Sequence, residues 1–336
     1  MLHAGAAEPV RLSDPAGFVA SIALRRFVAV LLLVAVLFPW LGGGFYTRLA
    51  IEALLLAATA LSVDVLLGYA GLLSLGQAAY FGLAAYITAL CYLHVTQSFW
   101  LVAAIVVIAV ALLSAALGAV AIRARGVYFA LITFGAAEIL SKIAHNTRAL
   151  GGSDGLIGIP VPSLQVLPGL KIALSDNMVF YYVVLAVIVL VYFGIRRVLN
   201  TGFGSVLRAI RDNSDRVAYL GYNPFWYKLV AYVLAAEVAA LGGLFYPLLR
   251  GFVAPNLFGF EISTQSVVMT LVGGVGTLIG PLLGGVIITF FESVIGSYTE
   301  RHLMVLGVIF VVFVLFLPDG LVGLARRSSH RRSGTS

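Results

Sequence analysis

Five carboxylates stand in or at the edges of strongly apolar stretches: Glu52, Asp64, Glu138, Glu237 and Glu292. A charge inside a lipid bilayer costs about 3 kcal/mol or more unless it finds a partner. Such carboxylates either line a water-filled path, where they can carry protons, or bond to backbone and hydroxyl groups at helix breaks. We favour the second interpretation for each of them, and the role of each stays open from sequence alone.

Ser153 lies in Gly151-Gly152-Ser153-Asp154-Gly155, which fits the G-x-S-x-G pattern of a nucleophilic serine. That pattern indicates a nucleophile only between a strand and a helix of a soluble sheet. Here it falls between two apolar stretches without a nearby base, and Gly, Ser and Asp are typical turn residues. We therefore expect a turn, and an intramembrane hydrolase using Ser153 is a less favoured class.

Other chemical sites are not indicated by the residue pattern. The histidines are scattered without metal-ligand spacing, and no G-x-x-x-x-G-K-[ST] sequence is present to bind a nucleotide. The single cysteine, Cys91, excludes an intramolecular disulfide. We expect no metal, no cofactor and no bond chemistry carried out by the chain itself.

The composition identifies the broad class of protein. Of 336 residues, 61% are hydrophobic and only 10% are charged, whereas a soluble domain carries about 25% charged residues. The net charge of +7 does not indicate nucleic-acid binding, because the basic residues lie in short segments between apolar runs. The chain is therefore expected to be a polytopic membrane protein.

The apolar runs are long and apolar on all sides, as expected of helices that cross a hydrocarbon core of about 30 Å. We predict an all-α integral membrane protein of about ten transmembrane helices with a weak internal inverted repeat. The eighth run is short enough to be a half-helix. The predicted spans are Phe27–Leu41, Leu49–Leu67, Leu75–Leu93, Phe99–Ile122, Val127–Ile143, Met178–Val198, Leu229–Leu248, Thr264–Val272, Pro281–Ile295 and Leu303–Leu317.

Lysine and arginine positions predict the orientation, because cytoplasmic loops carry an excess of both. With ten crossings, every basic segment and both termini lie on the cytoplasmic side. The predicted organisation is a cytoplasmic N-terminal segment (1–24), a polytopic transmembrane domain (25–325) and a basic cytoplasmic tail (326–336). The transmembrane domain includes an outer loop (144–177) and a cytoplasmic loop (199–228).

Two glycine-rich segments, 68–82 and 273–285, each come just before an apolar helix. Small residues recur four apart in both, as in Gly276, Gly280 and Gly284, and this spacing lets helix backbones approach closely in lipid. Glycine-interrupted segments at matching positions of two halves also indicate a transport pathway. We predict that Ser74, Gln77, Gly276 and Thr277 line such a path.

The predicted cytoplasmic loop contains two short helices. Val206, Leu207 and Ile210 give the first an apolar side, whereas Arg208 and Arg211 are polar. Asp212 or Ser214 is expected to cap the second helix and Gly221 to end it. An amphipathic pair at this place suits docking onto a partner protein or lying at the membrane surface.

Five motifs in order resemble the permease subunits of branched-chain amino acid importers of the ATP-binding cassette class. They are Gly68-Tyr-Ala-Gly71-x-Leu-Ser74-Leu-Gly76, Gly151-Gly152-Ser153-Asp154-Gly155-Leu156, Leu207-Arg208-Ala209-Ile210-Arg211-Asp212 with Gly221, Gly273-Gly274-x-Gly276-Thr277-x-x-Gly280-Pro281, and Phe316-Leu317-Pro318-Asp319-Gly320-Leu321. The likeness covers roughly residues 25–325. Leu72 and Gln77 depart from it, because Gln and His would be expected there, and Gly204-Ser205 stands where many members have Gly-Arg.

The resemblance implies a ten-helix permease that pairs with a second, homologous permease, two ATP-binding subunits and a periplasmic solute-binding protein. It also implies that Arg208, Arg211, Asp212 and Gly221 belong to the loop that contacts the ATPase. The expected function is import of amino acids, branched-chain ones in particular, across a bacterial inner membrane. The alternatives are import of urea, amides or aromatic acids by the same kind of permease, and proton-coupled secondary transport.

Overall fold

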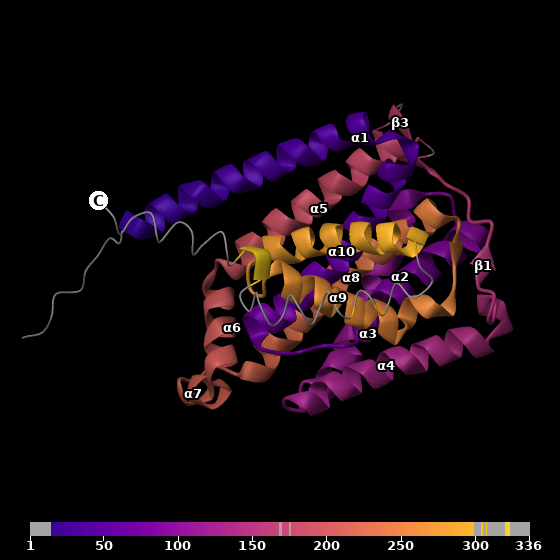
Figure 1. Ribbon diagram of the computed structural model, residues 1–336. Coiled ribbons are helices and arrows are strands. Elements are labelled where there is room, and N and C mark those ends of the chain that lie inside the picture. The colour runs from indigo at the N-terminus through magenta and orange to yellow at the C-terminus, as the bar shows by residue number, and fades with distance from the viewer. Residues whose placement is uncertain are drawn as a thin grey trace, which may run out of the picture.

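The computed structural model describes residues 15–167, 170–174, 176–298, 304, 307 and 320–322. Within this part, long helices lie alongside one another in a bundle (Figure 1). The short helices α6 (Gly202–Asp212) and α7 (Ser214–Tyr219) lie at one end of the bundle, and the strands lie at the other. This arrangement confirms the predicted helical membrane-protein class.

Helix α1 (Pro15–Asp64) contains the first two predicted spans. Gly43 has φ 65° and ψ 176°, a conformation that glycine adopts easily, and it joins two helical segments. Tyr181 Oη at the start of α5 (Asn177–Leu199) donates to the Ala35 carbonyl at 2.8 Å. Arg48 Nε donates to Asn177 Oδ1 at 3.1 Å, so the second segment starts at the same end of α5. The predicted spans leave a break at 42–48, and in the structure this break is a single kink at Gly43 with helix on both sides.

Seven described helices are long and apolar enough to cross a membrane. They confirm most of the predicted spans, whereas the prediction at 303–317 lies outside the described residues. Helix α9 has 14 residues, about 21 Å at 1.5 Å per residue, which is shorter than the hydrocarbon core. The seven are the second segment of α1 with the π-helical turn η1 (Gly43–Ala70), α2 with η2 (Gln77–Val95), α3 (Phe99–Ala121), α4 (Val127–Asn146), α5, α8 (Pro224–Arg250) and α10 (Ile279–Tyr298), with α9 at Phe260–Gly273.

The predicted outer loop carries short strands that the sequence did not indicate. Strands β2 (Ser163–Leu167) and β3 (Leu170–Ala173) form an antiparallel pair. Strand β1 (Leu156–Ile157) pairs with β4 (Phe252–Val253), which follows α8. The short 3₁₀ turns η3 (Arg148–Leu150) and η4 (Pro255–Phe258) complete this end. Such pairing satisfies backbone groups where the chain is not helical.

Contacts at the two ends of the bundle show which connecting segments lie together. Arg125 Nη2 lies 3.3 Å from Asp215 Oδ1, which places the α3–α4 connection beside α7. At the opposite end, the β1–β4 pair joins the predicted outer loop to the segment after α8. The two arginine-bearing connections at 123–125 and 196–228 therefore lie together at one end of the bundle.

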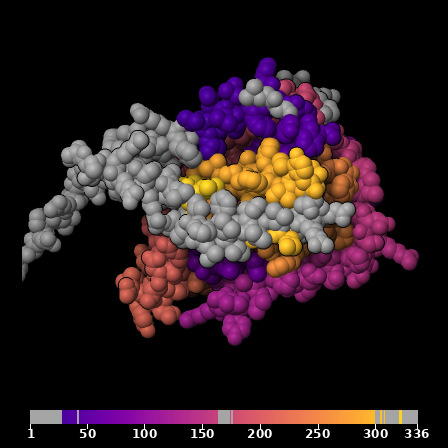
Figure 2. All heavy atoms as spheres, in the orientation of Figure 1, coloured from indigo at the N-terminus to yellow at the C-terminus, as the bar shows by residue number. Residues whose placement is uncertain are grey.

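The second segment of α1 forms the centre of the bundle. It packs against α5, α8, α9 and α10, and Ile51, Leu55 and Leu61 are at most 1% exposed. A methyl group on Gly285 of α10 would lie 2.6 Å from the Ala57 Cα, so these two backbones are in close contact. On the face shown in Figure 2, α10 reaches the surface beside the first segment of α1. The second segment of α1 is thus buried among its neighbours.

Candidate functional site

The first glycine-rich segment breaks the chain between η1 and α2. η1 (Val65–Ala70) ends at Gly71, whose φ is 68°. Ser74 and Gln77 follow, and both are buried. Gln77 Nε2 donates to Ser74 Oγ at 3.4 Å, and Ser62 Oγ of α1 donates to Gln77 Oε1 at 3.3 Å. These two predicted path residues therefore form a buried polar cluster with α1.

The second glycine-rich segment is held by Asp64, the last residue of α1. The fully buried Asp64 carboxylate accepts hydrogen bonds from the Gly276 amide at 2.5 Å and the Leu278 amide at 2.9 Å. Thr277 Oγ1 donates to the Gly274 carbonyl at 2.7 Å and accepts from the Gly280 amide at 2.9 Å, so it shapes the start of α10. Gly276 and Thr277 are partly exposed.

Both breaks meet at the end of α1. Ser62 and Asp64 are two positions apart on one helix, which turns their side chains about 200° from each other. Ser62 therefore contacts the first break and Asp64 the second. Gly68 of η1 brings the two breaks into direct contact, because a methyl group on Gly68 would lie 2.6 Å from the Gly276 Cα. The structure brings Gly276 next to the first break, although it comes from the other half of the sequence.

The small residues four apart pack helices closely, as predicted. A methyl group on Gly284 would lie 1.9 Å from the Met269 carbonyl oxygen of α9, and one on Gly280 would lie 2.5 Å from the Gly273 carbonyl oxygen. In the first repeat, a methyl group on Gly82 would lie 2.7 Å from the Phe258 ring. Close packing is thus confirmed as one use of these glycines.

Helices α6 and α7 confirm the two predicted short helices, with one correction. The cap of α7 is Asn213, whose Oδ1 accepts from the Arg216 amide at 2.8 Å, and neither Asp212 nor Ser214 takes that part. Asn213 is the last residue outside the helix, the position from which a side chain reaches the free amides of the first turn. Gly221, with φ 87°, follows the end of α7.

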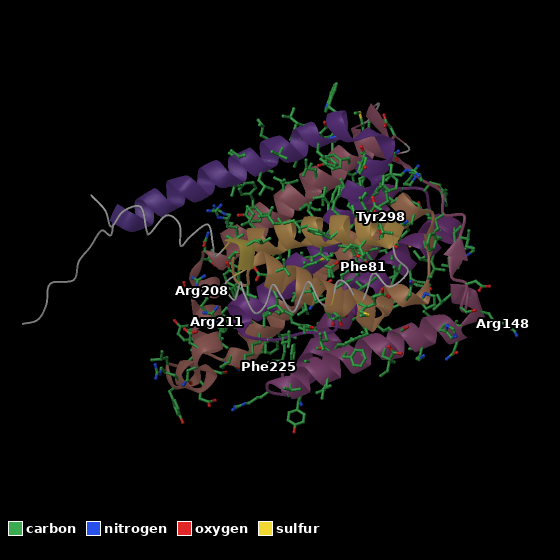
Figure 3. All side chains as sticks on the ribbon, in the orientation of Figure 1. Phe81, Arg148, Arg208, Arg211, Phe225 and Tyr298 are labelled. Carbon is green, nitrogen blue, oxygen red and sulfur yellow. The ribbon has the colours of Figure 1, made fainter. Side chains whose placement is uncertain are left out.

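Arg211 links α6 to the first break. Its Nη1 donates to the Gly68 carbonyl at 2.5 Å. Its side chain also packs against Gly71, because a methyl group on Gly71 would lie only 2.7 Å from the Arg211 Cγ. Asp212 lies 3.4 Å from the Arg211 Nε and is exposed. Arg208 donates to the Leu199 carbonyl at 3.2 Å, and its guanidinium carbon lies 6.0 Å from the centre of the Tyr69 ring. Figure 3 shows both arginines on the same helix at one end of the bundle.

Most of the carboxylates singled out from the sequence have partners. Glu52 pairs with Arg250 of α8, and Glu138 lies 3.6 Å from Lys142 on an exposed face of α4. Gln265 donates to Glu292. Glu237 Oε1 is buried without a hydrogen-bond partner among the described residues. Asp64 bonds to backbone amides at a helix break, as predicted. Arg250 was not predicted as a partner of Glu52, since a pairing across 198 positions leaves no mark in the local sequence.

The serine pattern forms a turn in the structure. Ser153 is exposed, lies between η3 and β1, and its Oγ donates to the neighbouring Asp154 carboxylate at 3.4 Å. This is not the strand-to-helix geometry of a nucleophile. In the described part of the chain, no three His, Cys, Asp or Glu side chains come together as a metal site.

Comparisons with known proteins agree with this arrangement. The family model described as branched-chain amino acid transport system / permease component matches residues 45–317. The chain is 28% identical to the high-affinity branched-chain amino acid transport system permease protein LivM of Escherichia coli (strain K12), over 93% of this chain and 78% of the relative. It is also 25% identical to LivH of the same organism over 36% of this chain and 39% of that relative.

A further relative, matched over a shorter stretch, is the autoinducer 2 import system permease protein LsrC of Yersinia pseudotuberculosis, 30% identical over 29% of each chain. No solved structure matches the chain. The family match covers most of the sequence, including both glycine-rich breaks and the α6–α7 pair. The chain is a multi-pass membrane protein and belongs to the family of branched-chain amino acid transport system permease components.

Proposed function

We propose that the chain is the translocating subunit of an ATP-binding cassette importer that carries amino acids, branched-chain ones in particular. The names of the LivM and LivH relatives support this substrate class. The proposed assembly contains a second, homologous permease, two ATP-binding subunits and a periplasmic solute-binding protein. In it, ATP hydrolysis belongs to the partner subunits.

One observation carries the proposal: the contacts that run from α6 to both glycine-rich breaks. Arg211 holds the Gly68 carbonyl, and the Tyr69 hydroxyl of the same turn donates to the Gly276 carbonyl at 3.3 Å. Asp64 binds the Gly276 amide from the other side. A displacement of α6 therefore reaches residues of both halves without passing through a flexible segment.

The outer surface of the α6–α7 pair suits a docked partner. Tyr219 is 91% exposed and Leu220 is 72% exposed, and both lie beside Gly221 at the end of α7. Exposed apolar side chains that cluster together mark protein or membrane contacts. We propose that an ATP-binding subunit covers them and that Arg208, Arg211 and Asp212 transmit its movement.

In the proposed cycle, closure of the ATP-binding subunits moves α6 and η1 and changes how the two breaks pack. Ser74, Gln77, Gly276 and Thr277 are the proposed path residues, because they sit at or beside these breaks. We propose that the α6–α7 end, both termini and the tail at 326–336 face the cytoplasm of a bacterium, since arginines gather at that end. The segments 1–24 and 25–325 then form the N-terminal segment and the permease domain.

Reconstitution tests this function. Proteoliposomes that contain the tagged chain and its co-purifying subunits should take up radiolabelled leucine only with ATP, and the chain alone should move none. Arg211→Ala should leave ATP hydrolysis active while uptake falls about tenfold, whereas Arg211→Gln, which keeps a hydrogen-bond donor, should lose less. Leucine uptake by the chain alone would contradict the proposal.

The alternative of proton-coupled transport has one supporting observation, the buried Glu237 Oε1 without a partner. It expects uptake by the chain alone that stops when the proton gradient collapses or when Glu237 is replaced by Gln. The other substrate classes are tested by adding unlabelled urea, amides or aromatic acids to the same vesicles. A carrier of one of these solutes should lose uptake of labelled leucine when that solute is present, whereas an amino acid importer should not.

A further inference from the structure

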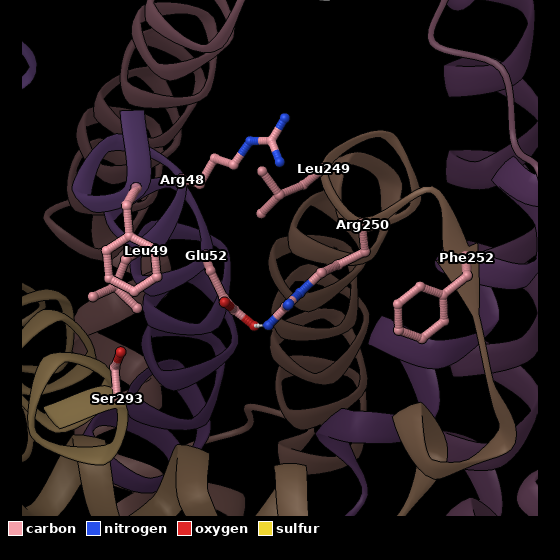
Figure 4. Close-up of a pocket in the computed structure, with 8 residues that line it drawn as sticks. Arg48, Leu49, Glu52, Leu249, Arg250, Phe252 and Ser293 are labelled. Carbon is pink, nitrogen blue, oxygen red and sulfur yellow. Dashed lines mark hydrogen bonds and ion pairs between the residues drawn. The ribbon is translucent and has the colours of Figure 1, made fainter. Parts of the chain in front are cut away.

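Two cavities share a wall at the end of the bundle opposite α6 and α7. The first, about 440 Å³, lies among α1, α8, β4 and α10 (Figure 4). The second, about 340 Å³, extends between α9 and α10 and shares Leu49, Glu52, Arg250 and Ser293 with the first. Sites for small molecules usually measure about 300 to 1,000 Å³. We call the joined cavities the vestibule.

Charges of both signs line the vestibule. Glu52 of α1 and Arg250 of α8 pair across it, and Figure 4 shows their charged ends meeting between the two helices. Arg48 adds a second guanidinium in the first cavity, and Glu261 and Glu292 add carboxylates in the second. The vestibule therefore offers acceptors for a cation and donors for an anion a short distance apart.

The vestibule also has an apolar wall. Phe45 and Leu49 of α1 and Phe252 of β4 line the first cavity beside the ion pair. Side chains of this kind bury an apolar group of a ligand, whereas charged side chains orient its polar end.

Thr289 provides a second, independent indication of a ligand. It lines the second cavity, is only 4% exposed, and its Oγ1 has no hydrogen-bond partner within the described part of the chain. Buried hydroxyl groups are nearly always hydrogen-bonded. A polar group held in the cavity would supply the missing partner.

We infer that the vestibule binds a zwitterionic α-amino acid with an apolar side chain before it is translocated. The ligand carboxylate binds Arg250, supported by Arg48, and the ligand ammonium binds Glu52. The apolar side chain lies against Phe45 and Phe252. This inference rests on the proposed function, because it assigns a site on this chain to the proposed substrate.

A zwitterion is selected because it can replace the Glu52–Arg250 pair charge for charge. When Glu52 and Arg250 separate, the ligand ammonium pairs with Glu52 and the ligand carboxylate pairs with Arg250, so every charge keeps a partner. A ligand with only one charge would leave either Arg250 or the Glu52 carboxylate, which is only 18% exposed, without its partner, and this lowers its affinity relative to a zwitterion. The vestibule should therefore discriminate by charge as well as by size.

The test is equilibrium binding of radiolabelled L-leucine to the full chain in nanodiscs of phosphatidylglycerol, a lipid whose headgroup is not zwitterionic. Unlabelled leucine should compete, whereas leucinamide, a cation at mildly acidic pH, and 4-methylpentanoate, an anion, should compete at least about tenfold more weakly. Arg250→Gln should weaken leucine binding and let leucinamide compete as well as leucine. Glu52→Gln should also weaken leucine binding, and it should let 4-methylpentanoate compete as well as leucine.

Two further variants make the result specific. Arg148→Ala removes an exposed arginine of the same end of the bundle that does not line the vestibule (Figure 3), so leucine binding should stay unchanged. Thr289→Val keeps the shape of the side chain and should weaken leucine binding severalfold without lowering thermal stability. A general loss of folding would lower binding without changing the order of the competitors.

The inference is overturned if the wild-type chain binds no leucine, if leucinamide competes as well as leucine, or if Arg250→Gln and Glu52→Gln leave the charge preference unchanged. ATP-driven uptake in proteoliposomes is measured in parallel. Normal ATP-driven uptake by a chain that binds no leucine would contradict the vestibule site but not the proposed function. Uptake that needs no nucleotide, together with normal leucine binding, would contradict the proposed function but not the vestibule site.

Discussion

Asp64 binds the backbone amide of Gly276, although 212 positions separate the two residues in the sequence. The carboxylate also binds the Leu278 amide, so one side chain at the end of α1 holds the loop that starts α10. Leu278 has φ 60°, an unfavourable value for a residue other than glycine. The Asp64 clamp therefore stabilises a strained turn next to the first break.

Replacing Asp64 tests this clamp. Asp64→Ala leaves two backbone amides without their acceptor, at a cost of about 1–3 kcal/mol each when they stay buried. We expect a clear fall of the thermal unfolding midpoint in detergent, with a smaller fall for Asp64→Asn, which keeps one acceptor oxygen. Asp154→Ala in the exposed outer turn is the control and should leave the midpoint unchanged.

The contact between Gly68 and Gly276 predicts a strong effect of a single methyl group. Gly68→Ala places its Cβ 2.6 Å from backbone atoms of Gly276, which cannot move aside as a flexible side chain can. We expect ATP-driven uptake to fall more than tenfold, together with a lower unfolding midpoint. Gly135→Ala in α4 is the matched control, because nothing lies within 4 Å of its added Cβ. Equal behaviour of the two variants would contradict the close contact.

The cap of α7 predicts how the docking surface responds to a local change. Asn213→Ala removes the acceptor of the Arg216 amide, a loss of about 1 kcal/mol in helix stability. Because α7 has only 6 residues, we expect it to fray and binding of the ATP-binding subunits to weaken in pull-down assays. Asn213→Ser keeps a capping oxygen and should retain binding. Loss of binding in both variants alike would point to a direct contact of Asn213 instead.

Glu138 predicts a negative result. It pairs with Lys142 one turn away on α4, so the two opposite charges neutralise each other on the same helix and neither needs a partner in a transport path. Glu138→Gln should leave leucine uptake and its nucleotide dependence unchanged. A variant that abolished uptake while the unfolding midpoint stayed normal would show a part for this carboxylate in transport.

Ser153 predicts a second negative result that concerns the rival enzyme class. Its hydroxyl lies exposed in a turn with only the neighbouring Asp154 as a hydrogen-bond partner among the described residues. Ser153→Ala should leave ATP-driven uptake normal. Loss of uptake in this variant, with the subunits still assembled, would support a chemical role for the Ser153 hydroxyl.

Local residue patterns were sufficient for the class of protein and for most helices. Long apolar runs form helices in lipid because their backbone groups must bond within the same segment, and this holds whatever the neighbours are. The two breaks and the α6–α7 pair were also predictable, since glycines and capping residues act over a few positions. The path assigned to Ser74, Gln77, Gly276 and Thr277 stays a prediction.

The pairings between distant segments could not be predicted. The sequence separated the first two spans at 42–48, whereas the fold decided that the reversed chain packs against α5 on both sides of Gly43. Asp64 with Gly276, Arg211 with Gly68 and Glu52 with Arg250 meet only after the helices have packed. Hydrogen bonds and ion pairs act over a few ångströms, so residue order establishes which groups need partners, whereas the fold in three dimensions decides which groups those partners are.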